Sequence, residues 1–334
     1  MKKTTMQDVA ELAGVSKSTV SQYINNRYEF MAVPTKLRIE QSIKELGYIP
    51  NYVAKSLKQK KTATIGVIVA NILHTFSTEV IRSIEDECGK NGLHLFVCNA
   101  DDQPEKERAY IEMLLAKQVD GLIIFPTNGN DDFYKQLKQM EFPIVFVDRK
   151  IDQPIFPTLL LDNESASQIA VDQLAGKGKK KIGLVSTSIA KKVTPRIERI
   201  EGFKKSVAKA GLAVEEDWIV AEERGLIGAE LQKVWDSGNR PEAFFATNDL
   251  SVIELLKFIK KNGLAIPDDL SVITIDDSPF LEIATPPITV IKQPTFEMGK
   301  DAANILVKLI ENKSFEERYE EKRYSPALVE RESI

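Results

Sequence analysis

Polar side chains that follow short β-rich runs are suited to bind a polar small molecule. Carboxylates and amides recur at these positions, and together they suit the hydroxyls of a polyol. In parallel sheets such ligands bind beyond the carboxyl ends of the strands. The residues selected by this rule are Asn71, His74, Phe76, Phe125, Thr127, Asp148, Arg149, Asn248, Asp249, Asp276 and Asp277. For Asp277, a structural role such as capping the next turn is an equal alternative.

Several cations lie in segments that border the same predicted site, namely Arg149, Lys191, Lys192, Arg196 and Arg199. A neutral sugar does not need so many cations, whereas a carboxylate or phosphate forms strong charge-assisted pairs with arginine. We therefore hypothesise an acidic sugar or a sugar phosphate as ligand. For the two lysines, solvated side chains in a loop are an equal alternative.

The sequence offers no catalytic constellation. Its two histidines, His74 and His94, lie near no nucleophile-elbow motif, and no phosphate-binding Gly-rich loop opens a helix. Cys88 and Cys98 form neither a disulfide framework nor a zinc-ligand spacing. We expect no enzyme activity, no cofactor and no metal.

The charge of the chain is divided unevenly. Residues 1–61 carry 11 lysines and arginines against 5 aspartates and glutamates, a net charge of +6, so the formal net charge of −4 leaves −10 for the remainder. A basic head on an acidic body attracts polyanions at one end, as expected for a nucleic-acid-binding module.

The first 25 residues predict two helices joined by a tight turn. Thr5 and Asp8 form a capping-box-like start, and Gly14 can end the first helix. Ser16 can cap a second helix that runs to about Asn25. The polar face of this second helix, formed by Lys17, Ser18, Ser21, Gln22 and Asn25, can meet base edges in a major groove about 12 Å wide.

Two further helices are predicted in this head. One begins at Thr35, places Ile39, Ile43 and Leu46 on its buried face, and stops at Gly47. The other is a short stretch over residues 51–58, which is marginal alone and should form only against a partner copy or DNA.

The remaining residues alternate strand and helix patterns. A first set runs from Ile65 to Val147 and a second from Lys181 to Ile275. This order predicts two lobes with parallel sheets and helices on both faces, and a ligand site between them.

Motifs along nearly the whole chain resemble the lactose-repressor (LacI/GalR) family of transcription regulators. They are Asp8-Val9-Ala10 to Ser21, Gly47-Tyr48-Ile49-Pro50-Asn51, Ile65-Gly66-Val67, Asp120-Gly121-Leu122-Ile123, Asn248-Asp249 and Asp276-Asp277. The resemblance implies a small all-α helix-turn-helix domain joined to an α/β two-lobed domain of the type I periplasmic-binding-protein kind, with parallel sheets. It places the helix-turn-helix domain at 1–49, a hinge helix and linker at 50–62, and an effector-binding and dimerisation domain at 63–334. Within this last domain, the N-lobe should take residues 63–160 and 292–322, and the C-lobe 161–291 and 323–334.

The resemblance also implies which residues bind DNA. Lys17, Ser18 and Gln22 match the positions that read the major groove, where Gln22 replaces the family's usual arginine. Leu57 matches the leucine that enters the minor groove at the operator centre, where an apolar wedge kinks DNA. The full candidate set for DNA is Thr5, Ser16, Lys17, Ser18, Thr19, Ser21, Gln22, Asn25, Asn51, Ala54 and Leu57.

For the effector, the resemblance implies contacts from Asp148, Arg199, Asn248, Asp276 and Gln293. The candidate effector-binding set is Phe76, Phe125, Asp148, Arg149, Arg196, Arg199, Asn248, Asp276 and Gln293. The family's usual Asn-Pro-Phe-Phe is replaced by His74-Thr75-Phe76-Ser77, so that wall of the pocket is altered. The sequence is also similar to repressors that respond to 2-keto-3-deoxygluconate.

The expected protein is a homodimeric, cytoplasmic repressor that binds a pseudo-palindromic operator, has no membrane partner, and responds to a small sugar-derived effector. The missing signal-peptide pattern and the absence of a long apolar run support this compartment. The rival interpretation is a sugar-binding protein of the periplasmic type without a DNA function, which the basic head argues against.

Overall fold

The computed structural model describes residues 4–49, 62–213, 215–311 and 321–334. The chain divides into two compact units, Met1–Thr62 and Ala63–Ile334, which are described separately. The predicted hinge helix falls within residues 50–61 and therefore lies outside the described residues.

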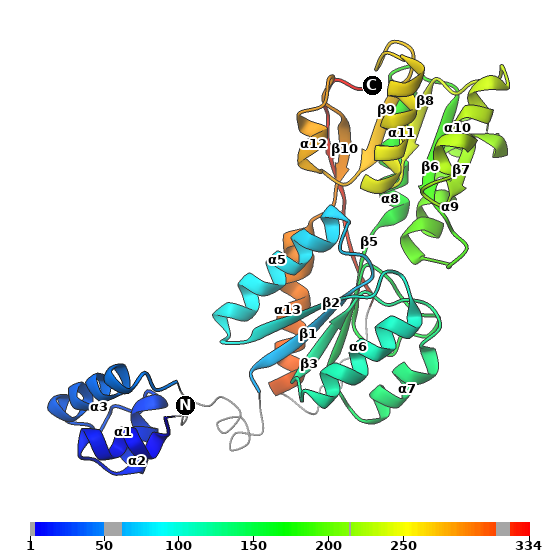
Figure 1. Ribbon diagram of the computed structural model, residues 1–334. Coiled ribbons are helices and arrows are strands. Elements are labelled where there is room, and N and C mark those ends of the chain that lie inside the picture. Colours follow the sequence, from blue (N-terminus) through cyan, green and yellow to red (C-terminus); the bar gives the residue numbers. More distant parts are fainter. Residues whose placement is uncertain (1–3, 50–61, 214, 312–320) are drawn as a thin grey trace. The chain divides into compact units, whose positions relative to one another are not determined.

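In the first unit, the described residues 4–49 form three helices around one small core (Figure 1). They are α1 (Met6–Ala13), α2 (Lys17–Ile24) and α3 (Val33–Leu46). Val9, Val20 and Ile39 are fully buried between them. The third helix begins at Val33, two residues before the predicted start, because Pro34 is well accommodated in a first helical turn.

The second unit has two lobes, each built on a six-stranded sheet. The N-lobe sheet has the order β11-β5-β4-β3-β1-β2 and is parallel throughout. Its strands are β1 (Thr64–Val69), β2 (His94–Asn99), β3 (Gly121–Ile124), β4 (Ile144–Val147), β5 (Thr158–Leu161) and β11 (Glu321–Tyr324).

Helices cover both faces of the N-lobe sheet (Figure 1). One face packs against α5 (Thr75–Lys90) and α13 (Thr295–Glu311), and the other against α6 (Pro104–Ala116) and α7 (Asp131–Gln139). Between α5 and α13, Gly299 permits a close approach, because an added Cβ would lie 2.8 Å from the Val80 carbonyl oxygen.

The C-lobe sheet has the order β12-β10-β9-β8-β6-β7, and only its edge strand β12 is antiparallel. Its strands are β6 (Ile182–Thr187), β7 (Ile219–Glu222), β8 (Ala243–Ala246), β9 (Ser271–Ile275), β10 (Thr289–Lys292) and β12 (Ala327–Val329). The helices are α8 (Asn163–Gly176), α9 (Thr194–Lys209), α10 (Ile227–Asp236), α11 (Asp249–Asn262) and α12 (Pro279–Glu282), with a 3₁₀ turn η1 at Glu216–Trp218.

The predicted fold class is confirmed by this architecture. The chain crosses between the lobes three times, after β5, after β10 and after β11. The third crossing follows Tyr324, two residues beyond the expected boundary at 322/323. Sequence reading predicted most of the strands and helices between β1 and β9. It missed β5 and α8, and it predicted no element after Ile275.

Candidate functional site

The helix pair of the first unit is fixed by local hydrogen bonds at its caps. The Thr5 backbone N–H donates to Asp8 Oδ2 at 2.7 Å, and the Asp8 N–H donates back to Thr5 Oγ1 at 3.3 Å. Gly14 ends α1 in the left-handed region at φ +62°. Ser16 then caps α2 by accepting a hydrogen bond from the Thr19 N–H at 3.1 Å.

These caps leave a polar face of α2 in solvent. Val20 is the buried residue of the helix, whereas Lys17, Ser18 and Gln22 are exposed. A short helix that presents an amide, a hydroxyl and a lysine from one face has donors and acceptors for base edges and phosphates.

The other predicted DNA residues fall into three groups. Ser16 and Thr19 serve the cap, with their hydroxyls 2.8 Å apart, and Thr5 caps α1. Ser21 and Asn25 are half-buried, and Asn25 Nδ2 donates to the Ser21 carbonyl oxygen at 2.7 Å. Asn51, Ala54 and Leu57 lie outside the described residues.

All nine predicted effector residues line one pocket in the second unit. The N-lobe contributes residues from α5 and from the ends of β3 and β4, and the C-lobe from α9 and the ends of β8, β9 and β10. The lining includes Phe76, Phe125, Asp148, Arg149, Arg196, Arg199, Asn248, Asp276 and Gln293. The rule that ligands bind beyond the carboxyl ends of strands, called the strand-end rule below, selected six of these nine. Arg196 came from the cluster of cations, and Arg199 and Gln293 from the family resemblance. Thr127, Asp249 and Asp277, which the strand-end rule also selected, do not line this pocket.

The pocket holds buried groups that bond one another. Arg199 donates from Nε to Asn163 Oδ1 at 2.8 Å and from a terminal nitrogen to the Thr247 carbonyl oxygen at 2.7 Å. Gln293 Nε2 donates to Asp276 Oδ1 at 2.6 Å. The free volume is about 40 Å³, which is too small for a sugar, so a ligand needs the lobes to separate or rearrange.

Burial dominates the electrostatics of this pocket. Desolvation raises the pKa of Asp276 to about 6, and repulsion from Asp249 adds to the shift. Desolvation also lowers the pKa of the Arg199 guanidinium, which the negative charge of Asp276 opposes. Both groups are held in a low-dielectric site where a ligand hydroxyl gains from a direct hydrogen bond.

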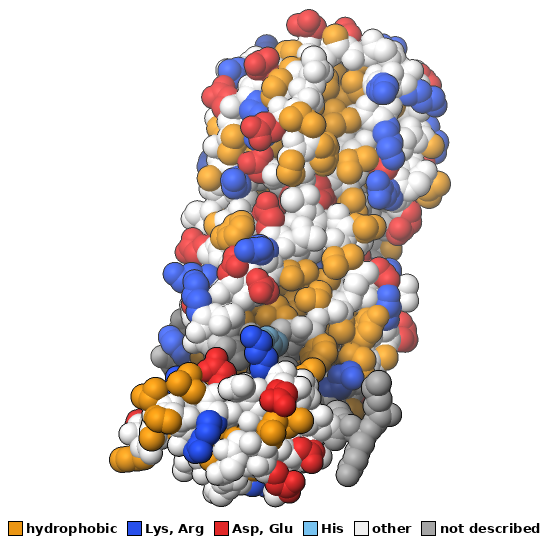
Figure 2. All heavy atoms as spheres, turned by 60° about the vertical axis from the view of Figure 1, so that its left-hand side comes forward, with side chains coloured by type: hydrophobic (Ala, Val, Ile, Leu, Met, Phe, Trp, Pro, Cys, Tyr) orange, Lys and Arg blue, Asp and Glu red, His pale blue; other side chains and the backbone are white. Residues whose placement is uncertain are grey.

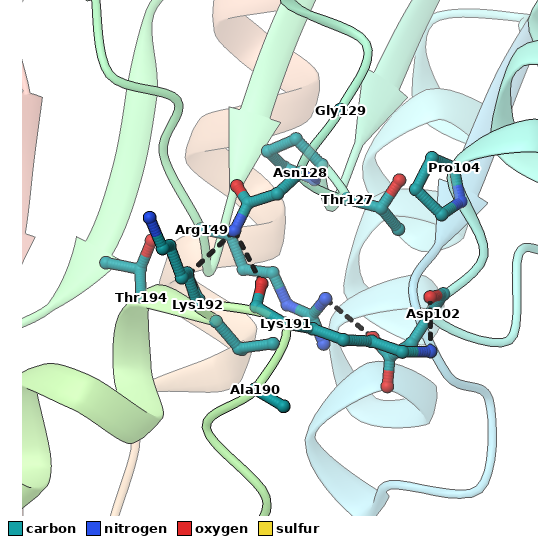
Figure 3. A pocket seen from close by; sticks show the side chains of 12 residues that line it. Asp102, Pro104, Thr127, Asn128, Gly129, Arg149, Ala190, Lys191, Lys192 and Thr194 are labelled. Carbon is teal, nitrogen blue, oxygen red and sulfur yellow. Dashed lines mark hydrogen bonds and ion pairs between the residues drawn. The ribbon is translucent and has the colours of Figure 1, made fainter.

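A larger cavity of about 320 Å³ adjoins this pocket and shares Arg149 and Val193 with it. Figure 3 shows its side chains, which come from both lobes. Asn128 Nδ2 donates to the carbonyl oxygens of Lys191 and Lys192 at 2.7 and 2.8 Å, so N-lobe and C-lobe loops meet at this cavity. We call it the outer cavity and the first one the inner pocket.

The structure shows where Asp277 and the two lysines lie, for which the sequence left both a structural and a ligand-binding role open. Asp277 does not line the inner pocket, and its Oδ1 accepts from an Arg331 terminal nitrogen at 2.6 Å, so it has a structural partner. Lys191 and Lys192 are exposed and line the outer cavity, where Lys191 Nζ donates to the Asp102 carbonyl oxygen at 2.8 Å.

Both units match known proteins. The profile of bacterial regulatory proteins of the lacI family matches residues 5–51, and that of the periplasmic binding protein-like domain matches residues 171–334. The probable HTH-type transcriptional regulator EndR of Paenibacillus polymyxa is 45% identical over 334 residues, which cover 99% of this chain and 98% of EndR. This chain belongs to the LacI family.

Further LacI-family relatives agree with this result. The HTH-type transcriptional repressor PurR of Aliivibrio salmonicida (strain LFI1238) is 34% identical over 333 residues, covering 99% of this chain and 98% of PurR. The crystal structure of the lac repressor bound to ONPG in the repressed state has a TM-score of 0.87 at 25% identity, with 100% of both chains covered.

The LacI-family relationship confirms the predicted family and makes this chain a DNA-binding transcriptional regulator, not an enzyme. The match at residues 5–51 also excludes the rival interpretation of a periplasmic-type protein without a DNA function. Among the described residues, no group of histidine, cysteine, aspartate and glutamate side chains could hold a metal ion, and no helix is long and apolar enough to cross a bilayer.

Sequence reasoning missed several residues of this LacI-family site. Asp102 follows β2 and Asn163 follows β5, so the strand-end rule would have found both had it been applied to those strands. Asn128 and Ser278 also follow strands, β3 and β9, but sequence reading stopped one residue short of each, at Thr127 and Asp277. Both residues make contacts between the lobes. Thr75 Oγ1 lies 2.7 Å from Ser278 Oγ across the two lobes.

A second contact across the lobes involves two residues that the strand-end rule did select. His74 Nδ1 lies 2.6 Å from Asp249 Oδ1, and the Thr75 N–H donates to Asp249 Oδ2 at 2.7 Å. His74 belongs to the altered wall of the pocket. In this LacI-family chain the substituted wall therefore binds the opposite lobe directly.

Proposed function

We propose that this chain is a homodimeric repressor whose affinity for a pseudo-palindromic operator is set by a small sugar-derived effector bound in the inner pocket. The convergence of nine polar and aromatic residues from both lobes on that pocket carries the proposal. Asp148, Asn248 and Asp276 are the residues we assign to ligand hydroxyls. We place the protein in the cytoplasm, where a bacterial regulator meets genomic DNA.

Contacts between the lobes support control by ligand. The lobes touch through His74 and Asp249 on one side and through Asn128 and the loop of Lys191 on the other. A ligand that binds one arrangement of the lobes better than another shifts the population between them. A coupling of roughly 1 to 3 kcal/mol changes operator affinity about 5- to 150-fold.

Pairing of two chains is supported by the need to place two reading helices and by the surface of the second unit. Figure 2 brings the side of α5 and α12 forward and shows hydrophobic side chains gathered along the body. Large apolar residues such as Leu73, Phe96 and Ile283 are 68%, 41% and 82% exposed. Many exposed apolar side chains on one face are typical of interaction sites.

The effector is proposed to be an acidic sugar such as 2-keto-3-deoxygluconate, or a sugar phosphate. Arg149, Arg196 and Arg199 all line the inner pocket, and two of them are nine-tenths or more buried. Buried guanidinium groups favour planar anions because they form paired hydrogen bonds with them.

The test replaces Arg199 with alanine. Arg199→Ala should leave operator binding intact and abolish the response to effector, because the side chain lies in the inner pocket and not in the DNA-binding head. Gel shift with DNA upstream of the chain's own gene, with and without a panel of neutral and acidic sugars, measures both properties. Release of operator by the variant at wild-type effector concentrations would show that the pocket assignment is wrong.

A further inference from the structure

Asp102 joins arginines from both lobes. It follows β2 in the N-lobe, and its Oδ1 accepts from an Arg149 terminal nitrogen at 2.6 Å. Its Oδ2 accepts from a terminal nitrogen of Arg196, on α9 of the C-lobe, at 3.3 Å. Burial opposes ionisation, yet the charges of Arg149 and Arg196 hold the pKa of Asp102 below its usual range. One carboxylate thus serves two guanidinium groups.

The outer cavity carries an excess of positive charge. Arg149, Lys191 and Lys192 line it, and Asp102 is the one carboxylate among the described residues of its lining. In Figure 3 the Arg149 guanidinium and the Lys191 ammonium both lie next to Asp102. The lining itself therefore has three positive charges against one negative charge.

Arg149 also has an unused donor. Its side chain is 6% exposed, and its Nε has no hydrogen-bond partner among the described residues. Asp148 Oδ2 is 3.5 Å from this nitrogen, too far for a good hydrogen bond. Buried N–H groups without a close acceptor are rare in proteins, so a ligand or water oxygen that accepts from this nitrogen would be stabilised.

The inner pocket and the outer cavity differ in the ligand groups that their side chains can bind. The inner pocket holds Asp148, Asn248 and Asp276, which suit hydroxyls, but it has only about 40 Å³ of free volume. The outer cavity has about 320 Å³ and the cationic lining. Arg149 belongs to both, so a ligand that reaches from one to the other passes this side chain.

We propose that the outer cavity is an anion subsite of the effector pocket. The carboxylate or phosphate of the ligand binds Arg149, Lys191 and Lys192 there, and it replaces Asp102 between Arg149 and Arg196. Asp102 is thus an internal competitor that neutralises the arginines until the ligand arrives. This inference rests on the proposed function, because it needs the polyol part of the same ligand in the inner pocket.

Isothermal titration calorimetry of the full chain tests the subsite. The probes are 2-keto-3-deoxygluconate, gluconate and glucose 6-phosphate, with glucose as the neutral counterpart. We expect one of the anionic probes to bind and glucose to bind at least about tenfold more weakly, as lost charge-assisted hydrogen bonds predict. A sugar acid and a sugar phosphate are distinguished by which probe binds. Glucose as the tightest ligand would overturn the inference.

Two variants address the outer cavity directly. Lys191→Ala/Lys192→Ala should weaken the anionic probe about tenfold or more, because both cations leave the lining. Asp102→Asn should strengthen it several-fold, since the competing charge is gone. Lys260→Ala/Lys261→Ala removes the same charge from exposed positions on α11 and should leave affinity nearly unchanged. Thermal melts verify that each variant is folded.

The outcomes separate this inference from the proposed function. If Arg199→Ala loses ligand while the Lys191/Lys192 and Asp102 variants bind the anionic probe as the wild type does, the subsite is wrong and the inner pocket stands. If Arg199→Ala also binds as the wild type does, the pocket itself is wrong. An equal loss in the Lys260/Lys261 control would reduce the effect to overall charge and overturn the subsite.

Discussion

Asp276 is a buried carboxyl group in the inner pocket, which we assign to ligand hydroxyls, and its burial makes the stability of the protein depend on pH. Its pKa is raised to about 6 by desolvation first and by Asp249 second. Between the ordinary aspartate pKa of about 4 and this value, the folded protein binds a proton that the unfolded chain does not. Asp276 therefore adds to the free energy of unfolding as the pH falls through 6, and it lowers this free energy at neutral pH.

Replacing Asp276 by asparagine should remove this pH dependence. At pH 7.5 we expect Asp276→Asn to be more stable than the wild type by roughly 1–3 kcal/mol, because a costly buried charge is gone. The advantage should disappear near pH 4.5, where the wild-type carboxyl is protonated. Urea unfolding at several pH values measures this, and a difference that does not change with pH would contradict the assignment.

Helices α5 and α13 illustrate how one position decides the packing of two elements. A Cβ at Gly299 would approach Ser83 Cβ to 2.6 Å and the Val80 carbonyl oxygen to 2.8 Å, and a carbonyl oxygen of a helix cannot move aside easily. Gly299→Ala should therefore destabilise the protein by about 1–3 kcal/mol, despite the better helix propensity of alanine. Thermal or urea unfolding provides the measurement.

Gly89 is a matched control in the same helix pair. It lies on α5, is exposed, and has no atom within 4 Å of an added Cβ. Gly89→Ala should stabilise by about 0.5–1 kcal/mol, because only the conformational entropy and helix propensity change. If both variants shifted stability in the same direction, close packing at Gly299 would not be the cause.

The two lobes are connected by a network centred on Glu198. Its carboxylate accepts from both terminal nitrogens of Arg323 on β11, at 2.9 and 2.8 Å, and from Asn163 Nδ2 at 2.8 Å. Asn163 in turn accepts from Arg199 in the inner pocket. Bonds therefore run continuously from an N-lobe strand to the pocket arginine, and Asn163 and Glu198 position that arginine.

Replacing Glu198 should lower the free energy of unfolding and should also free the Asn163 side chain that holds Arg199. We expect Glu198→Ala to lower the free energy of unfolding by about 1–3 kcal/mol, because a paired arginine and a buried amide lose an acceptor. Lys204→Ala breaks the exposed pair with Glu216 and should change stability by less than about 1 kcal/mol. Urea unfolding measures the free energy of unfolding of both variants. An equal loss in both would contradict a larger stabilising contribution from the Glu198 network than from an exposed ion pair.

The amino-acid pattern by itself determined the class of the fold and most of the pocket. Strand and helix periodicity is local, and the carboxyl ends of parallel strands meet at one edge of each sheet. Asn248 and Asp276 in one lobe, and Asp148 in the other, could therefore be predicted to lie at the edges that border a ligand site between the lobes. The caps at Thr5, Gly14 and Ser16 were readable for the same reason, since capping acts within a few residues.

Only the tertiary structure decided which groups bond across the lobes. Asp102 lies 47 residues from Arg149 and 94 from Arg196, and no spacing rule connects them. The sequence showed five cations near the site but not that one carboxylate already holds two of them. Partners far apart in sequence are chosen by packing, which depends on every element at once. This is why charge counting predicted an anion site and the fold was needed to propose where the anion binds.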